Sequence, residues 1–187
     1  MVQTPPKVLT LAEFLQLPET KPASEYRDGQ IWQKPMPQGK HSVIQGELVA
    51  AINAVVKTRR IARAFPELRC TFGGRSTVPD IAVFRWERIP REATGEVANT
   101  FLIAPDWTIE ILSPDQSHTK VTKKLLQSLQ AGTEMGWLID PAEQTVFVYR
   151  PNQIPEAVDD LDVVIPCPTF AAEFRLTLQA LFDWLLI

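Results

Sequence analysis

Cysteine, histidine and long apolar runs are scarce in this chain. Only two of the 187 residues are cysteines, and only two are histidines. Cys70 and Cys167 lack the spacing of metal-binding cysteines, so we expect two reduced thiols, with a structural disulfide as the alternative. No apolar run approaches the roughly 18 residues of a membrane span, and the first seventeen residues lack the features of a signal peptide. These absences predict a cytoplasmic protein that does not associate with a membrane.

An excess of basic residues is absent as well. The net charge is −3 and the isoelectric point is about 5.5, which counts against an extended, nonspecific nucleic-acid surface. The distribution of charge matters more than its sum, and basic residues cluster at two places: Lys57, Arg59, Arg60 and Arg63, and Lys120, Lys123 and Lys124. We interpret the first cluster as a solvated helix face.

Length and residue pattern predict a single domain over residues 1–187, of which residues 1–8 form a loose N-terminal arm. Hydrophobic periodicity and turn residues predict the following elements: a helix from Thr10 to Pro18, a hairpin over 25–33, a helix over 41–57, strands over 69–72, 77–84 and 107–112, a helix from Pro114 and Asp115 to Gln130, a hairpin over 136–150, a strand over 162–165 and a helix over 176–186. This order predicts an α/β fold with a central mixed sheet flanked by helices.

Two carboxylates interrupt apolar strand segments thirty residues apart. Asp80 lies in the segment VPDIAVF, and Glu110 lies in the segment WTIEILS. A buried carboxylate costs several kcal/mol unless it is paired or ligates a metal. Alternate residues of a strand share a face, so Glu110 points with Thr108 and Leu112. If the two strands are neighbours, both carboxylates can converge on one ion.

The residues that follow this pair favour phosphate chemistry. Mg²⁺ prefers hard oxygen ligands, with Mn²⁺ as the expected substitute, and such an ion can acidify a bound water as the nucleophile. Lys120 and Lys124 lie four residues apart and share one face of the predicted helix, and an ammonium group can stabilise charge on a phosphate. We therefore expect a Mg²⁺-dependent enzyme that hydrolyses DNA phosphodiester bonds, acting as a homodimer.

A set of short motifs occurs in a specific order along the chain. The motifs are Glu25 to Gln30, the helix start at His41, Pro79-Asp80, Glu110 to Pro114, Lys124, Ala131-Gly132 and Trp137 to Pro141. In this order and spacing they resemble the Uma-two family of putative restriction endonucleases, which belongs to the PD-(D/E)XK nuclease superfamily. The resemblance covers roughly residues 10 to 180.

The resemblance implies a restriction-endonuclease-like fold and a set of site residues. Asp80 and Glu110 would be the metal-binding acids, together with Ile111, and Glu25 would be an accessory acid near the metal. The usual lysine position of the superfamily, two residues after the second acid, is Leu112 in this chain. The Uma-two family places its lysine on the following helix, and Lys124 falls at that place. Asp80, Glu110, Lys124 and Glu25 are therefore the expected catalytic residues.

The chain departs from the family pattern at two positions, which leaves an alternative function open. Lys120 stands where family members usually carry an acid, and Ser128 stands where they carry a tyrosine. The alternative is a catalytically silent nuclease-fold module that binds nucleic acid or a protein partner. Taken one by one, the residues also have structural interpretations: Asp80 as a cap of backbone amides after Pro79, Glu110 as an edge-strand acid that faces solvent, and Lys124 as a solvated helix lysine.

Other residues are interpreted as structural. His41 is expected to satisfy local polar groups at a helix start. The tryptophans Trp32, Trp107, Trp137 and Trp184 are expected in the core or at a subunit interface rather than as base-stacking platforms. The apolar residues near the C-terminus, from Leu181 to Ile187, give a third hypothesis, an oligomerisation surface, although some of them are expected in the core.

Overall fold

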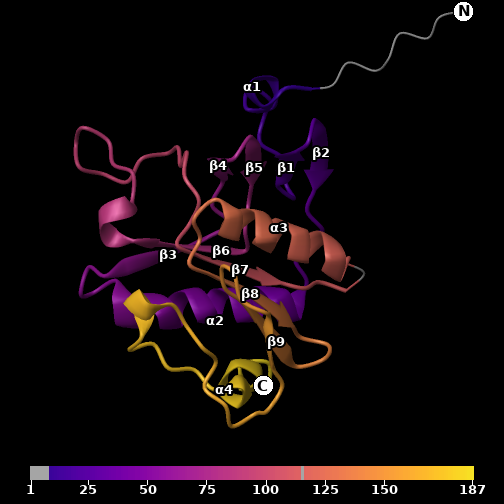
Figure 1. Ribbon diagram of the computed structural model, residues 1–187, viewed down its shortest axis with the longest axis vertical. Coiled ribbons are helices and arrows are strands. Elements are labelled where there is room, and N and C mark those ends of the chain that lie inside the picture. Colours follow the sequence, from indigo (N-terminus) through magenta and orange to yellow (C-terminus); the bar gives the residue numbers. More distant parts are fainter. Residues whose placement is uncertain (1–8, 115) are drawn as a thin grey trace, which may run out of the picture.

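The computed structural model describes residues 9–114 and 116–187, and these residues form two β-sheets with helices around them (Figure 1). The larger sheet is mixed and has the strand order β10-β9-β8-β7-β6-β3, while the smaller one is antiparallel with the order β2-β1-β5-β4. The larger sheet contains β3 (Ala62–Pro66), β6 (Ile81–Arg85), β7 (Trp107–Ile111), β8 (Met135–Asp140), β9 (Thr145–Tyr149) and β10 (Glu156–Val158). The smaller sheet contains β1 (Ser24–Arg27), β2 (Gln30–Gln33), β4 (Cys70–Phe72) and β5 (Arg75–Thr77).

Helices cover both faces of the larger sheet. The longest helix, α2 (Gly39–Val56), packs with α4 (Leu178–Asp183) on one face, where Ile109 and Trp137 point. Helix α3 (His118–Gln130) packs on the other face through Val121 and Leu125. Strands β7 and β8 run parallel and are joined by α3, which is the crossover connection that parallel neighbours require. The expected mixed sheet flanked by helices is confirmed.

The β1–β2 hairpin presents its two faces to different parts of the molecule. Asp28 and Gly29 have positive φ angles of 52° and 79°, as the tight turn between two strands requires. The turn sets the register in which Glu25 pairs with Trp32. Because paired residues share a face and alternate residues point the same way, Glu25, Arg27, Trp32 and the following Lys34 lie on one face of the hairpin.

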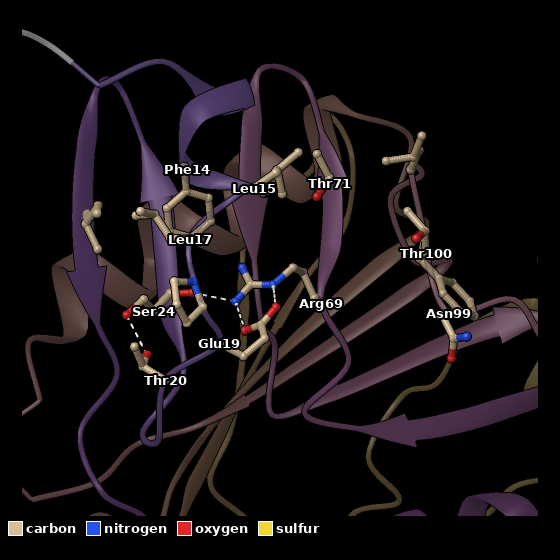
Figure 2. Close-up of a pocket in the computed structure, with 14 residues that line it drawn as sticks. Phe14, Leu15, Leu17, Glu19, Thr20, Ser24, Arg69, Thr71, Asn99 and Thr100 are labelled. Atoms are coloured by element: carbon tan, nitrogen blue, oxygen red, sulfur yellow. Dashed lines mark hydrogen bonds and ion pairs between the residues drawn. The ribbon is translucent and has the colours of Figure 1, made fainter.

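The other face of the hairpin borders the larger of the two main cavities, which has a volume of about 540 Å³. Figure 2 shows that this cavity lies between the small sheet, the turn after α1 (Leu11–Phe14) and the loop that carries Asn99 and Thr100. Inside it the Arg69 guanidinium is already occupied by both carboxylate oxygens of Glu19, at 2.8 and 2.6 Å. The lining is otherwise mostly apolar, so this cavity does not contain the predicted chemistry.

The strand predicted over residues 77–84 is wrong, because the chain leaves one sheet and enters the other within it. β5 ends at Thr77 in the small sheet, and β6 begins at Ile81 in the large one. Pro79 has no N–H group and cannot continue a ladder of backbone hydrogen bonds. The linking residues Val78 to Asp80 therefore have backbone groups free to bind side chains, and four side chains bind them.

Several other sequence expectations need correction. The strand predicted over 162–165 is absent from the described residues as a regular strand, and only an isolated bridge joins Val164 to Thr177; the sixth strand is β10 instead. The basic cluster from Lys57 to Arg63 is not a helix face as we expected, because α2 ends at Val56 and Arg63 lies on β3, which pairs with β6. The last helix is shorter than predicted, because Leu181 and Phe182 are buried while Leu186 and Ile187 are exposed beyond it. The loose arm at residues 1–8 and the predicted helix start at Asp115 lie outside the described residues.

We predict that Gly136→Ala destabilises the protein by about 1–3 kcal/mol, the usual cost of overpacking a core. A Cβ atom at Gly136 on β8 would lie 3.1 Å from Cδ2 of Leu125, which is fully buried on α3. The matched control is Gly46→Ala on the exposed side of α2, where an added Cβ meets nothing within 4 Å, so we expect a gain of about 0.5–1 kcal/mol. Urea unfolding measures both variants. Equal or greater stability of Gly136→Ala would show that α3 moves away from the sheet without cost.

Candidate active site

Asp80 and Glu110 lie side by side on neighbouring strands. β6 and β7 pair with Ile81 opposite Ile109, and the same register continued by one residue places Asp80 opposite Glu110. Both carboxylates are 2% exposed, on the side of the sheet that α3 covers. Directly paired residues on antiparallel strands have Cβ atoms about 4.5–5.5 Å apart. Two like charges are thus held together in the core, and this arrangement needs positive charge nearby.

Two buried lysines supply that charge, one from each side. Nζ of Lys34, which follows β2, lies 2.6 Å from Asp80 Oδ1. Nζ of Lys124, on α3, lies 2.9 Å from Glu110 Oε1 and 2.5 Å from Glu25 Oε1. The five side chains of these residues form a closed cluster of three carboxylates and two ammonium groups.

The backbone of Val78 ties the cluster to the link between the sheets. Its carbonyl oxygen accepts hydrogen bonds from Lys34 Nζ at 2.9 Å and from Lys124 Nζ at 3.0 Å. Its N–H group donates to Glu25 Oε1 at 2.8 Å. The backbone of one residue therefore fixes both lysines and the accessory acid, so each ammonium is held in place by a carbonyl as well as by a carboxylate.

Helix α2 holds Asp80 from a third direction. His41 Nε2 lies 3.4 Å from Asp80 Oδ1, and His41 Nδ1 lies 3.2 Å from the Ser113 hydroxyl. Gln45, one turn along the helix, donates from its side chain to the Asp80 carbonyl at 2.8 Å. The Ile111 N–H group donates to Asp80 Oδ2 at 2.7 Å. Both oxygens of Asp80 thus have polar partners, and its side chain has little freedom to rotate.

The environment separates the proton affinities of the two carboxylates. Burial by itself would raise the pKa of Asp80, but Lys34, and after it His41, hold that pKa well below its usual range. Burial, and then the negative charge of Asp80, raise the pKa of Glu110 to about 7 against the opposing effect of Lys124. Burial disfavours the Lys124 ammonium, yet Glu110 and Glu25 raise its pKa. Paired acids with pKa values pushed apart are typical of catalytic sites.

Glu110 retains one oxygen that a further ligand could use. Its Oε1 is near the Lys124 ammonium but is buried without a hydrogen bond among the described residues. The described residues contain no group of three or more histidine, cysteine or acidic side chains arranged to hold a metal. Mg²⁺ needs only one or two carboxylates, because it keeps several of its waters. Asp80 and Glu110 are hard oxygen donors of the kind that fits such an ion, while Ile111, which has no polar side chain, contacts the site through its N–H group, a donor to Asp80 Oδ2.

The cluster opens into a cleft of about 420 Å³. The cleft is lined by the hairpin face that carries Glu25, Arg27, Trp32 and Lys34, by Glu110, and by the stripe of α3 that contains Lys120 and Lys124. Trp107 and Trp137 are buried in the core as expected. Trp32 is partly exposed in this cleft and is not a core residue, so of the two places expected for it only a subunit interface stays a prediction.

The sequence matches the model of the Uma2 family, described as "Putative restriction endonuclease", over residues 11–179. The chain belongs to the Uma2 family. A solved structure of "a putative nuclease belonging to DUF820" from Anabaena variabilis is 69% identical to it, with a TM-score of 0.94, and the match covers 95% of this chain and 99% of that one. No curated protein matches the chain. The fold of this Uma2 protein and its resemblance to the family are thus confirmed.

The structure brings the four residues predicted to be catalytic into one cluster. Lys124 forms ion pairs with Glu25 and Glu110, and Glu110 lies opposite Asp80 on the neighbouring strand. Ile111 contacts Asp80 through its N–H group. Lys34 and His41 also belong to the cluster of this Uma2 protein, and sequence reasoning missed Lys34 and treated His41 as a structural residue. The signal for Lys34 is the alternation of the hairpin, which places it on the same face as Glu25.

We predict that Glu110 makes this Uma2 protein less stable as the pH rises from 5 to 8 in the presence of a chelator. Between pH 4.5 and about 7 the unfolded chain has lost the Glu110 proton while the folded protein keeps it, so unfolding releases a proton and stability falls as pH rises. A tenfold change in proton affinity is about 1.4 kcal/mol, so the loss is on the order of 3 kcal/mol.

The measurement is urea unfolding of wild type and Glu110→Gln at both pH values. The glutamine variant cannot ionise, so its stability should fall less than that of wild type across this range. Contributions from ionisable groups outside the cluster cancel in the difference between the two proteins. Parallel pH profiles would mean that Glu110 ionises normally inside the cluster.

Proposed function

We propose that this protein is a metal-dependent endonuclease that hydrolyses DNA phosphodiester bonds at the Asp80–Glu110 cluster. The observation that carries the proposal is the pair of buried, adjacent carboxylates with lysine ammonium groups against them, of which Glu110 lines an open cleft. Membership of the Uma2 family, and a structural relative described as a nuclease, support the same reaction class.

Asp80, Glu110 and the carbonyl of Ile111 would hold Mg²⁺, with Mn²⁺ as a substitute. When bound, the ion would polarise a phosphoryl oxygen and lower the pKa of a bound water. The protein residues contribute orientation and charge. Lys34 and His41 keep Asp80 ionised and fixed, and Glu110 lines the inner end of the cleft, where a phosphate would be partly withdrawn from water.

Lys124 would stabilise the negative charge of the phosphate. Its ammonium lies between Glu110 and Glu25 and is anchored by the Val78 carbonyl, so its position does not depend on the substrate. A preorganised ammonium stabilises charge that develops on a transferring phosphoryl group at little reorganisation cost. Glu25 would be a positioning residue that holds Lys124 in the direction of the cleft.

The silent module remains the competing proposal, and the departures at Lys120 and Ser128 motivate it. Ser128 is buried on α3, and its hydroxyl donates to the backbone carbonyl of Lys124 at 3.2 Å. Its side chain is thus bound within the helix and does not line the cleft. Lys120 is exposed on the cleft rim, outside the carboxylate cluster. Neither departure removes a member of the cluster, and for that reason we favour the enzyme.

We predict that wild type cleaves DNA with Mg²⁺ or Mn²⁺, and that Asp80→Asn and Glu110→Gln reduce the rate at least 100-fold. Both substitutions remove charge at nearly constant size. The test uses supercoiled plasmid and labelled single- and double-stranded oligonucleotides, with Glu156→Gln as the control, because Glu156 forms an exposed ion pair with Arg150.

Metal titration by calorimetry separates the two proposals. An enzyme should bind Mn²⁺ through Asp80 and Glu110, and the two variants should lose that binding while Glu156→Gln keeps it. A wild type that neither cuts any substrate nor binds metal through these residues would leave the silent module as the function of the domain.

A further inference from the structure

Three residues at the mouth of the cleft form a cationic cluster that the carboxylate site does not use. The Arg27 guanidinium carbon lies 4.9 Å from the centre of the Trp32 ring system, and Lys120 Nζ lies 4.5 Å from it. Arg27 and Trp32 come from the hairpin, and Lys120 comes from α3, one helical turn before Lys124. All three line the same cleft as Glu25 and Glu110.

The two cations of this cluster have no acidic partner among the described residues, whereas many other arginines of the chain do. Arg69, Arg75, Arg85, Arg88 and Arg150 each lie against a carboxylate. Arg27 and Lys120 instead lie over the same indole, although two like charges repel. An aromatic face attracts cations by about 0.5–2 kcal/mol, so Trp32 provides a reason for both to stay at the rim.

The charge of the side chains that line the cleft differs between its inner end and its rim. Its inner end holds the carboxylates of Glu25 and Glu110 with two lysines, and its rim holds two cations without carboxylates. An anion that enters the cleft meets Arg27 and Lys120 first. Arginine can bind two phosphate oxygens at once and lysine acts as a point charge, so this rim matches the backbone of a polynucleotide better than it matches a single small anion.

We propose that Arg27, Trp32 and Lys120 form a phosphate-binding subsite that holds a DNA backbone phosphate next to the one at the carboxylate cluster. This inference rests on the proposed function. Lys124 serves the inner phosphate, and Lys120 serves the outer one. Trp32 is a positioning residue whose ring holds the two cations.

The subsite also accounts for the lysine at position 120. An acid there would lie over the same indole, remove half of the positive charge of the rim and repel the DNA backbone. In this chain the outer contact is made by a residue that approaches from α3 while Arg27 approaches from the hairpin. The hairpin and α3 would therefore each contribute one cation to the DNA backbone.

The experiment measures DNA binding without cleavage. Fluorescence anisotropy in EDTA follows a labelled 20-base-pair duplex, and the same strand unpaired, across a salt series with full-length protein. Each lost phosphate contact lowers the slope of log affinity against log salt by about 0.9 for duplex DNA. We expect Lys120→Ala and Arg27→Ala each to lower the slope by about that amount and to weaken binding several-fold.

Matched controls separate a subsite from general charge. Lys123→Ala removes an exposed lysine of the same helix that does not line the cleft and should leave the slope near that of wild type. Trp32→Leu removes no charge, yet it should lower the slope as well, and Trp32→Phe should restore much of it. Trp86→Leu is the control for that substitution, because Arg60 lies over Trp86 outside the cleft.

The outcomes are decisive and independent of the nuclease assay. Equal effects of Lys120→Ala and Lys123→Ala, or no effect of Trp32→Leu on the slope, would overturn the subsite. Because no metal is present, a protein that never cuts DNA can still pass this test, and the endonuclease alone would then be wrong. Conversely, loss of cutting in Asp80→Asn together with an unchanged slope in Lys120→Ala would leave the endonuclease and remove the subsite.

Discussion

The burial of two adjacent carboxylates is the constraint on which the rest of the site depends. Asp80 and Glu110 are neighbours because β6 and β7 pair there, and neither can reach solvent. Leaving either charge without a partner would cost several kcal/mol, so cations must come from outside the large sheet. The hairpin brings Lys34 and α3 brings Lys124, and both ammonium groups meet at the carbonyl of Val78. That carbonyl is free because Pro79 interrupts the strand.

Because the lysines must reach the buried carboxylates, the positions of α3 and of the β1–β2 hairpin relative to the large sheet can vary little. α3 must approach the sheet closely for Lys124 to reach Glu110, and Gly136 on β8 permits that approach because a Cβ there would press on Leu125. The hairpin must keep its register for Lys34 and Glu25 to share a face, and the positive φ angles of Asp28 and Gly29 set that register. Backbone conformation and close packing outside the cluster thus determine which charges meet in it.

Sequence reasoning reached the carboxylates more easily than their partners, for a physical reason. A charged residue inside an apolar strand is conspicuous, so Asp80 and Glu110 stand out. Lys34 lies next to a proline after a short, mostly exposed strand, where a lysine is ordinary. Its importance appears only when the turn at Asp28 fixes the hairpin and alternation is followed one residue past the last paired one. The split between β5 and β6 was missed because Val78 and the apolar residues of β6 look like one strand, and only Pro79 marks the change of sheet.

The position of the lysine follows from the packing of α3. Leu112 lies two residues after Glu110 and on the same side of β7, where it packs with Val121 and Leu125 of the helix. A lysine at that position would bury its charge in this contact and remove an apolar residue that holds α3 in place. Supplying the ammonium from Lys124 leaves the contact intact and brings the charge to the same carboxylate. Because α3 then carries both the inner lysine and, one turn earlier, Lys120, the helix that completes the cluster also forms a wall of the cleft through which DNA would approach.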